Sequence, residues 1–264
     1  MKRIVILYSG GLDSLCMAKW AEVHYPYDEV IKLWFDIGQP YREFEQQALP
    51  DDVVQRRIDW MQPGQKTVGK KDSKSKSGDI FIPGRNLVFA VMAACVELPD
   101  EIWIGALNGE TTPHNHDKNE AFLFGANQTI NYVLQNFLEQ PLRVRFPLVE
   151  AGFNKLTATR WLIQNGATLD EVTATRSCLS GDEKPCGKCI VCLRRWGVFS
   201  QLGFSEGYQH HPMTQRENFA VIKEMLFGDH YETTRKNEIL PAVFDYFGTN
   251  IPELVLQRFK EELE

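Results

Sequence analysis

The chain has 264 residues, of which 43% are hydrophobic and 24% charged. This composition is that of an ordinary globular protein and excludes a fibrous or wholly disordered chain. The formal net charge of −6 argues against nucleic acid as a direct ligand, although a local basic patch would be compatible with it. No stretch reaches the roughly 18 consecutive apolar residues that span a bilayer, and the apolar run near the N-terminus is shorter than a secretory signal. We therefore expect a cytoplasmic protein without a membrane partner.

The first part of the chain alternates strand-like and helix-like segments. An apolar, β-branched run over residues 3–8 predicts a strand buried on both faces. Alternating strands and helices favour right-handed crossovers, and hence an α/β fold with a doubly wound parallel sheet. Further strands are expected over residues 29–37, 53–60 and 101–107, and helices over 15–23, 41–48 and 87–96.

Residues 62–79 interrupt this alternation. The segment is rich in Lys, Ser and Gly and nearly free of apolar residues, so it cannot bury enough surface to offset its ordering entropy. It is either a solvated surface loop or a lid that brings positive charge over a phosphate-bearing ligand. Its lysines stand at positions 66, 70, 71, 74 and 76.

The last fifty residues have a helical pattern. Thr214 and Glu217 fit a capping box, and Gly228 is placed to end the helix that follows. Two further amphipathic segments are expected over residues 237–247 and 252–263.

A Ser-Gly-Gly-Leu-Asp-Ser motif lies between the first expected strand and the first helix, at residues 9–14. Glycines allow the backbone to turn sharply, so that its amides and the following helix N-terminus face an anion. Ser9 and Ser14 offer hydroxyl donors, whereas Asp13 would repel phosphate unless Mg²⁺ lay between them. The motif is neither a Walker loop nor a dinucleotide fingerprint. It resembles the PP-loop of the N-type ATP pyrophosphatases, and we prefer this interpretation to a ligand-free turn.

Four of the six cysteines form a cluster with spacings of seven, two and two residues: Cys178, Cys186, Cys189 and Cys192. Short spacings let the thiolates meet one metal ion, and four sulfurs fill a tetrahedral Zn²⁺ shell without an open position. Free buried cysteines and an iron–sulfur cluster are the alternatives, but we favour one structural zinc per chain. Cys16 and Cys95 are expected to fill core space. The charge of the thiolates would be offset by Lys184, Lys188, Arg194 and Arg195.

Further motifs follow in an order that is similar to one known family. Phe-Asp-Ile-Gly-Gln occupies residues 35–39, Pro-Gly-Arg-Asn-Leu occupies residues 83–87, and Lys155 precedes the cysteine segment. Together with the first loop and the cysteines, these residues resemble the 7-cyano-7-deazaguanine synthases of queuosine biosynthesis. The resemblance covers about residues 3–203.

The resemblance implies a PP-loop ATP pyrophosphatase α/β domain over residues 1–175 and a zinc-binding segment over 176–204, and the helical pattern adds a C-terminal extension over 205–264. It implies an ATP-dependent ligase that converts 7-carboxy-7-deazaguanine and ammonia to the nitrile through adenylated intermediates, with Mg²⁺–ATP as substrate, and it implies a homodimer. Asp13, Arg85 and Lys155 would be catalytic. The implied ATP-binding residues are Leu7, Tyr8, Ser9, Gly10, Gly11, Leu12, Asp13, Ser14, Leu15, Cys16 and Met17, and the implied substrate-binding residues are Asp36, Gln39, Arg85, Asn86, Asp117 and Phe122.

Two features depart from that family. Residues 115–122 keep only Asp117 and Phe122 of its usual pattern, and the chain beyond about Ser205 is longer than expected. Two other functions therefore stay open: an adenylating enzyme such as a tRNA thiolase, or a synthase-like module of a defence or DNA-modification system. Arg85 could also be a plain surface residue at a helix start, and His114 and His116 could be simply solvated.

Overall fold

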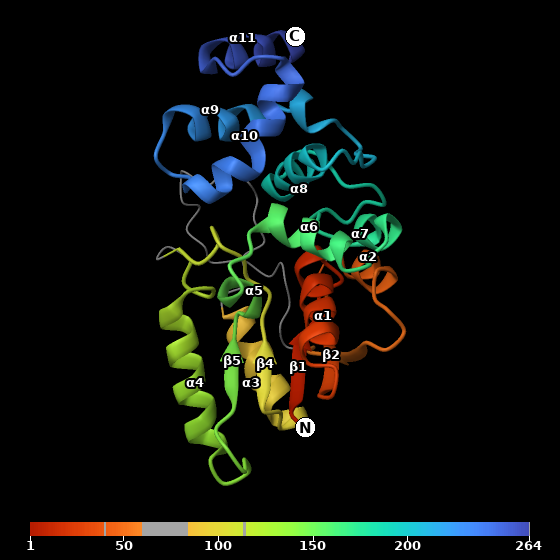
Figure 1. Ribbon diagram of the computed structural model, residues 1–264, viewed down its shortest axis with the longest axis vertical. Helices are drawn as coiled ribbons and strands as arrows, with labels where there is room; N and C mark the ends of the chain where they lie inside the picture. Colours follow the sequence, from red (N-terminus) through yellow and green to blue (C-terminus); the bar gives the residue numbers. More distant parts are fainter. Residues whose placement is uncertain (40, 60–83, 113–114, 264) are drawn as a thin grey trace. The chain divides into compact units, whose positions relative to one another are not determined.

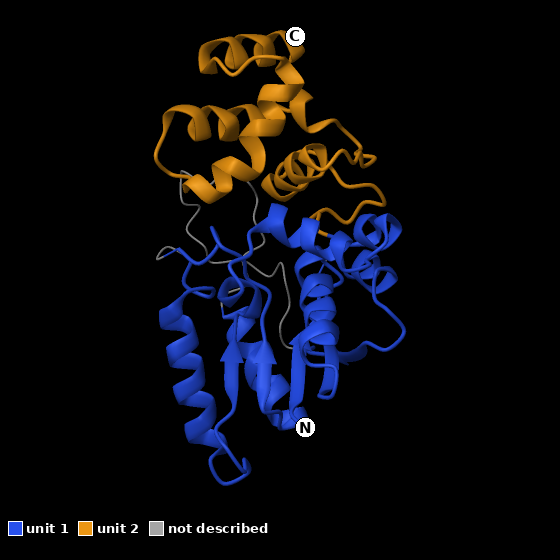
Figure 2. Cartoon of the chain, viewed as in Figure 1, with its two compact units in different colours: residues 1–65, 82–176 blue, residues 66–81, 177–264 orange. Residues whose placement is uncertain are grey.

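The computed structural model describes residues 1–39, 41–59, 84–112 and 115–263. The lysine-rich segment 62–79 and His114 lie outside the described residues. Figure 2 shows two compact units, of which the first comprises residues 1–65 and 82–176. The second is described over residues 177–263. The cysteine segment and the helical extension, expected as separate parts, therefore belong to the same compact unit.

The first unit is built on a parallel sheet with the strand order β3-β2-β1-β4-β5 (Figure 1). Its strands are β1 (Arg3–Leu7), β2 (Glu29–Asp36), β3 (Val54–Arg57), β4 (Glu101–Trp103) and β5 (Arg143–Arg145). Central β1 pairs with β2 on one side and with β4 on the other, so that Ile6 lies opposite both Lys32 and Trp103. The carboxyl ends of β1 and β4 thus meet where the strand order reverses, which is where open α/β sheets bind ligands.

Helices cover both faces of this sheet. On one face, α3 (Arg85–Glu97) and α4 (Glu120–Leu134) share a core with Val5 and other strand residues. Ile4 and Ile6 alternate with Val5, face the other side and are fully buried. There α1 (Leu12–His24) packs against β1, and α6 (Lys155–Gln164) packs against α1. The doubly wound parallel α/β fold is confirmed. The remaining helices of this unit are α2 (Arg42–Gln47), α5 (Pro147–Glu150) and α7 (Leu169–Ala174).

The outer edge of β5 is closed by two side chains of α4. The Asn127 amide donates to Val144 O at 3.0 Å and accepts from Val144 N at 2.8 Å. Asn131 bonds both backbone groups of Leu142 in the same way. An exposed strand edge is a template for further pairing, and these amides remove it. The sequence did not predict β5, because Arg-Val-Arg has no apolar run.

The second unit is helical, with α8 (Ile190–Gln201), a 3₁₀ turn η1 (Pro212–Thr214), α9 (Arg216–Phe227), α10 (Thr233–Phe247) and α11 (Pro252–Leu263). Its core is formed by α8, η1, α9, α10 and α11 together, with Leu193, Met213, Ile222, Val243 and Phe259 at its centre.

Several local expectations can be compared with these helices. Gly228 ends α9 as predicted, and α11 has the predicted bounds. The capping box was wrong: Thr214 lies in η1, where its hydroxyl donates to His211 O, and α9 has no side-chain cap. Cys16 is buried as expected, whereas Cys95 is exposed and fills no core space. Within the described residues, no helix is long and apolar enough to cross a membrane.

Candidate active site and metal centre

The predicted phosphate loop follows the central strand directly. Gly10 adopts a φ of +70°, and a Cβ there would lie 3.1 Å from the backbone oxygen of Glu45. Glycine is therefore required both by backbone conformation and by close packing. The carbonyl of Gly10 accepts a hydrogen bond from Arg176 N at 2.9 Å, and Gly11 is the N-cap of α1. The loop is thus a tight strand-to-helix turn whose backbone leads into a helix N-terminus.

The first turn of α1 supplies partial positive charge and few free side chains. The Ser14 hydroxyl donates to Gly11 O at 2.8 Å, so its proton is used inside the loop. Leu12, Cys16 and Met17 are buried, with relative exposures of 1%, 0% and 0%. Their side chains are core residues, which leaves the backbone groups of the loop and the exposed Ser9 side chain as donors for an anion.

The structure brings two of the three predicted catalytic residues together across 142 positions of sequence. Lys155 is the first residue of α6, a helix whose N-terminus is held by a capping box between Asn154 and Thr157. Its Nζ lies 2.8 Å from Asp13 Oδ1, and the two side chains are 8% and 22% exposed. A shielded ammonium group therefore stands beside the first turn of α1, next to the loop.

A second cluster centres on Glu45 in α2, which sequence reasoning missed. Its Oε2 accepts hydrogen bonds from Gln39 Nε2 at 2.6 Å and Trp34 Nε1 at 3.1 Å. Burial raises the pKa of the Glu45 carboxyl, while the bonds from Gln39 and Trp34 and the charge of Arg85 oppose that rise. Since the Glu45 backbone also packs on Gly10, this cluster adjoins the phosphate loop. No motif marks Glu45, because it lies in an ordinary charged helix.

Arg85, the first residue of α3, belongs to the same neighbourhood. It is half-buried and hydrogen-bonds Tyr41, whose pKa is raised by burial and held back by the Arg85 charge. The next residue, Asn86, donates from Nδ2 to both the backbone oxygen and Oδ2 of Asp117, each at 3.1 Å. Two predicted substrate residues therefore contact each other although 31 positions separate them.

The remaining predicted substrate residues are placed differently. Asp36 Oδ1 accepts from Gly38 N at 2.7 Å and so shapes the turn after β2. Phe122 stacks parallel to Phe146, with ring centroids 6.2 Å apart, and packs against the core. The Phe122 ring is therefore held by packing against the core of the first unit. His116 is exposed.

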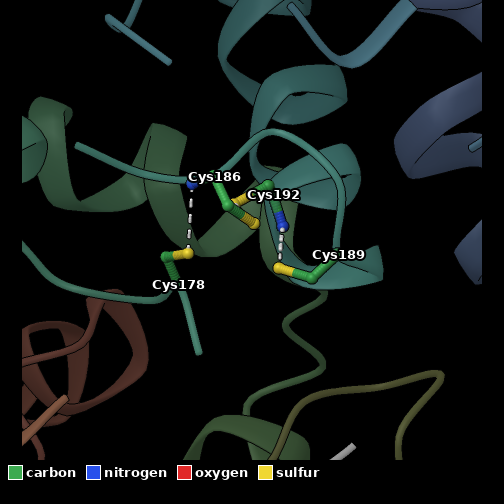
Figure 3. A group of neighbouring side chains, drawn as sticks. All are labelled: Cys178, Cys186, Cys189 and Cys192. Atoms are coloured by element: carbon green, nitrogen blue, oxygen red, sulfur yellow. Dashed lines mark hydrogen bonds between the residues drawn. The ribbon is translucent and has the colours of Figure 1, made fainter. Parts of the chain in front are cut away.

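The four predicted cysteines come together in the second unit (Figure 3). Their sulfurs all lie within 4.8 Å of one another, and the Sγ atoms of Cys186 and Cys192 are 3.9 Å apart. A tetrahedral zinc ion with Zn–S bonds of about 2.3 Å separates its sulfurs by about 3.8 Å. The cluster therefore fits a single metal ion.

Backbone amides support this cluster. Cys186 N donates to the Sγ of Cys178 at 3.3 Å, and Cys192 N donates to the Sγ of Cys189 at 3.4 Å (Figure 3). Hydrogen bonds from the Cys189 and Cys192 thiols lower the pKa of Cys178, and this sharing of protons raises the pKa of Cys189 to about 12. The two backbone amide donors favour the thiolate state of Cys178 and Cys189, which is the state that a metal needs.

The two arginines expected to balance the thiolates have carboxylate partners. Arg194 is paired with Glu238 at 2.5 Å, and Arg195 with Glu206 at 2.8 Å. All four side chains are at most 11% exposed. Carboxylates of the second unit therefore share the charge of both arginines.

Comparison with known proteins adds the family. The curated 7-cyano-7-deazaguanine synthase of Pyrococcus horikoshii is 29% identical over 243 residues, covering 77% of this chain and 95% of the relative. That of Pyrococcus abyssi gives the same values, and that of Prochlorococcus marinus is 27% identical over 217 residues, covering 74% and 92%.

One solved structure, the U34-tRNA thiolase NcsA from Methanococcus maripaludis with its [4Fe-4S] cluster, aligns with a TM-score of 0.33 and 12% identity. The alignment covers 99% of this chain and 72% of the thiolase chain. At this level of similarity, neither its fold nor its cluster carries over to this chain.

A family model described as queuosine biosynthesis protein QueC matches residues 3–203, a range that holds the phosphate loop, Lys155 and all four clustered cysteines. The match covers well over half of the chain, and the chain therefore belongs to the QueC family.

Proposed function

We propose that the chain is a 7-cyano-7-deazaguanine synthase, an ATP-dependent ligase that forms a carbon–nitrogen bond. It would convert 7-carboxy-7-deazaguanine and ammonia to 7-cyano-7-deazaguanine through adenylated intermediates. The observation that carries this proposal is the Ser-Gly-Gly turn with the Lys155–Asp13 pair beside it, inside the region that matches the QueC model.

The arrangement suits activation of a carboxylate. A carboxylate is a poor electrophile, and transfer of AMP from ATP to it, with release of pyrophosphate, would make AMP the leaving group when ammonia attacks to give the amide. A second adenylation, at the amide oxygen, would let that oxygen leave with AMP and form the nitrile. The loop amides and the N-terminus of α1 would hold the phosphates of ATP, and Lys155 would add a positive charge close to them. Asp13 would exchange its ion pair with Lys155 for the Mg²⁺ of the nucleotide. The attacking groups belong to the substrates, so no nucleophilic side chain is required.

The cluster around Arg85 would bind the deazapurine substrate. A guanidinium group suits bidentate contact with a carboxylate or phosphate. Tyr41, Glu45 and the Asn86–Asp117 contact orient this region and supply further donors and acceptors. Gln39 is fixed by Ile37 N and Glu45, which directs its amide.

For the second unit we propose one structural Zn²⁺ bound by the four cysteines. Four thiolates complete a zinc shell and leave no open position for catalysis. An iron–sulfur cluster places several irons and sulfides between its cysteines, and the close approach of these sulfurs favours a single ion instead. Elemental analysis of the purified protein tests this choice.

We also propose a homodimer and a cytoplasmic location. Light scattering tests the oligomeric state, and cell fractionation tests the location.

The function is tested by mass spectrometry of purified protein with Mg²⁺–ATP, ammonium and 7-carboxy-7-deazaguanine. The expected products are the nitrile, AMP and pyrophosphate, none of which should form when ATP is omitted. Lys155→Gln should lower turnover by about 100-fold or more, as for loss of a charge-stabilising donor. Lys19→Gln, which removes a half-buried lysine paired with Glu22 on α1, should leave turnover unchanged.

Other outcomes would redirect the proposal. AMP release without nitrile would indicate an adenylating enzyme with another acceptor, such as a tRNA to be thiolated. Absence of turnover from folded, metal-replete protein would contradict a free-standing synthase and favour a module that needs a protein or DNA partner.

A further inference from the structure

The chain beyond residue 203 lies outside the QueC match, yet it contacts the cysteine cluster closely. We propose that Asn218, in α9 of this extension, is a positioning residue for the metal centre, and that metal and extension stabilise each other. This inference concerns the metal centre alone and does not depend on the catalytic reaction proposed above.

Asn218 holds the loop between two of the metal ligands. It is fully buried, and its Nδ2 donates to Gly187 O at 2.8 Å and to Pro212 O at 2.9 Å. Gly187 directly follows Cys186 and precedes Cys189 by two positions. One amide group therefore ties the turn that carries both cysteines to η1 of the extension.

The backbone of the extension also packs against the same turn. A Cβ on Gly187, which has a φ of +73°, would lie only 1.7 Å from His210 O. Next to it, Gln209 N donates to Pro185 O at 2.8 Å. A turn with this backbone needs glycine, and it closes on a carbonyl that the extension supplies.

The helix that carries Cys192 is held by the extension as well. Arg194 of α8 forms two hydrogen bonds with Glu238 of α10, at 2.5 and 2.8 Å, and both side chains are buried. At Gly197, a Cβ would lie 2.7 Å from Glu238 O, so the two helices are in close backbone contact. A buried pair of this kind fixes the relative position of α8 and α10.

Three of the four ligands thus sit on segments that the extension fixes, and Cys178 is held by Cys186 N. Groups that orient metal ligands commonly contribute about 10–100-fold to affinity. Because binding and folding are thermodynamically linked, metal that needs the extension must in turn stabilise it. The extension is, on this proposal, a scaffold for the metal centre.

The decisive variant is Asn218→Asp, which keeps the side-chain size but turns a carboxylate oxygen towards two carbonyls. We expect zinc affinity, measured by competition with a chromophoric chelator, to fall by about 10-fold or more. The Co²⁺-substituted protein should show altered absorption bands, since the ligand field reports on sulfur geometry. The matched control is Asn131→Asp in the first unit, whose amide likewise donates to two backbone carbonyls, Asn127 O and Leu142 O, each at 2.8 Å, without touching the cysteine turn.

The control should lower thermal stability yet leave zinc affinity and the Co²⁺ spectrum unchanged. If Asn218→Asp binds zinc like the parent with the same Co²⁺ spectrum, or if both variants lose affinity in proportion to stability, the positioning role is wrong. Should Asn218→Asp not fold, hydrogen exchange on the parent protein decides the matter. Chelation should expose the amides of η1 and α9 together with those of residues 186–193. Retained protection of α9 after complete metal removal would overturn the proposal.

Discussion

The two units build their sites in opposite ways. In the first, the candidate site residues lie in the loop after β1 and in helices that flank the parallel sheet, such as α1 and α6, so that the sheet and its helices position them. In the second, a short cysteine turn has little structure of its own and is held by helices that follow it in sequence. A sheet can fix a site without a ligand, whereas a loop of this kind would depend on its neighbours and on the proposed metal. The units should therefore respond differently to the loss of single groups.

The largest difference is expected on removal of the metal. Cys192→Ser should abolish tight metal binding, since the proposed zinc ion would then keep three thiolates. Binding energies of structural zinc in small domains are on the order of 10 kcal/mol, comparable with the whole stability of a small domain. The second unit should unfold at physiological temperature while the first unit keeps its cooperative transition, as measured by calorimetry and limited proteolysis.

The exposed Cys95 supplies the control. Cys95→Ser removes a thiol from the same chain and should leave both transitions in place. If Cys192→Ser instead shifts both transitions equally, the two units unfold as one, and the contrast between them would be lost.

The second effect concerns a buried charge in the first unit. Glu101 is 2% exposed and bonds Lys2 at 2.9 Å, Trp103 at 2.9 Å and Arg145 at 2.6 Å. Burial raises the pKa of this carboxyl, but the three hydrogen bonds outweigh burial and lower it below its usual value. The charged form therefore stabilises the fold above the unfolded-state pKa, and this contribution disappears as pH falls through the folded-state pKa.

Glu101→Gln should accordingly lower the stability of the first unit by about 2–3 kcal/mol at pH 7. The difference in stability between the variant and the parent should disappear at low pH, because the parent carboxyl is then protonated and uncharged as well. Denaturant titrations from pH 7 to pH 3 measure it. Glu29→Gln, in an exposed pair with Arg3, should cost well under about 1 kcal/mol. Equal effects of the two variants would show that burial of the Glu101 network is unimportant.

The sequence predicted those features of each unit that depend on residues close together in the chain. Contiguous signals were sufficient for the phosphate loop and the cysteine cluster, because glycine conformation and thiolate spacing are local properties. The doubly wound sheet followed from alternating apolar runs. Lys155 came from resemblance, and only the structure shows its carboxylate partner, Asp13.

What the sequence did not predict depends on partners far apart in the chain. Glu45 lies in an unremarkable charged helix, and its role emerges only where α2 packs beside Gly10. Asn218 has no motif, since its partners are two backbone carbonyls. Strand β5 is three residues long and is defined by pairing with β4 and by Asn127. The expected capping box failed because Thr214 is used by η1 instead.

A third, smaller effect tests the phosphate loop itself. Gly10→Ala imposes left-handed backbone on alanine and places its Cβ 3.1 Å from Glu45 O. We expect a loss of about 1–2 kcal/mol in the stability of the first unit and weaker ATP binding by calorimetric titration. Gly152→Ala separates the causes, because Gly152 has a φ of +78° with nothing within 4 Å of an added Cβ. Equal losses would mean that close packing on α2 contributes nothing.

The smallest change in stability is expected for a substitution at Glu45, which should stabilise the first unit rather than destabilise it. Burial raises the pKa of this carboxyl, so the folded state is penalised at pH values above that pKa, and the penalty vanishes below the unfolded-state pKa. Glu45→Gln, whose amide oxygen can still accept from Gln39 and Trp34, should stabilise the first unit by about 0.5–1 kcal/mol at pH 8. The gain should shrink towards zero as pH falls to about 4.5.

We expect the same substitution to lower kcat/KM, because the charge of Glu45 that faces Arg85 is lost. Glu43→Gln, on the exposed side of the same helix, should change neither stability nor turnover. A gain in stability together with lower activity would show that the charge of Glu45 is unfavourable for folding but needed by the site. The second unit, by contrast, pairs its buried charges Arg194 and Glu238. Unchanged activity in Glu45→Gln would instead make Glu45 a packing residue, and the cluster around it would no longer belong to the site.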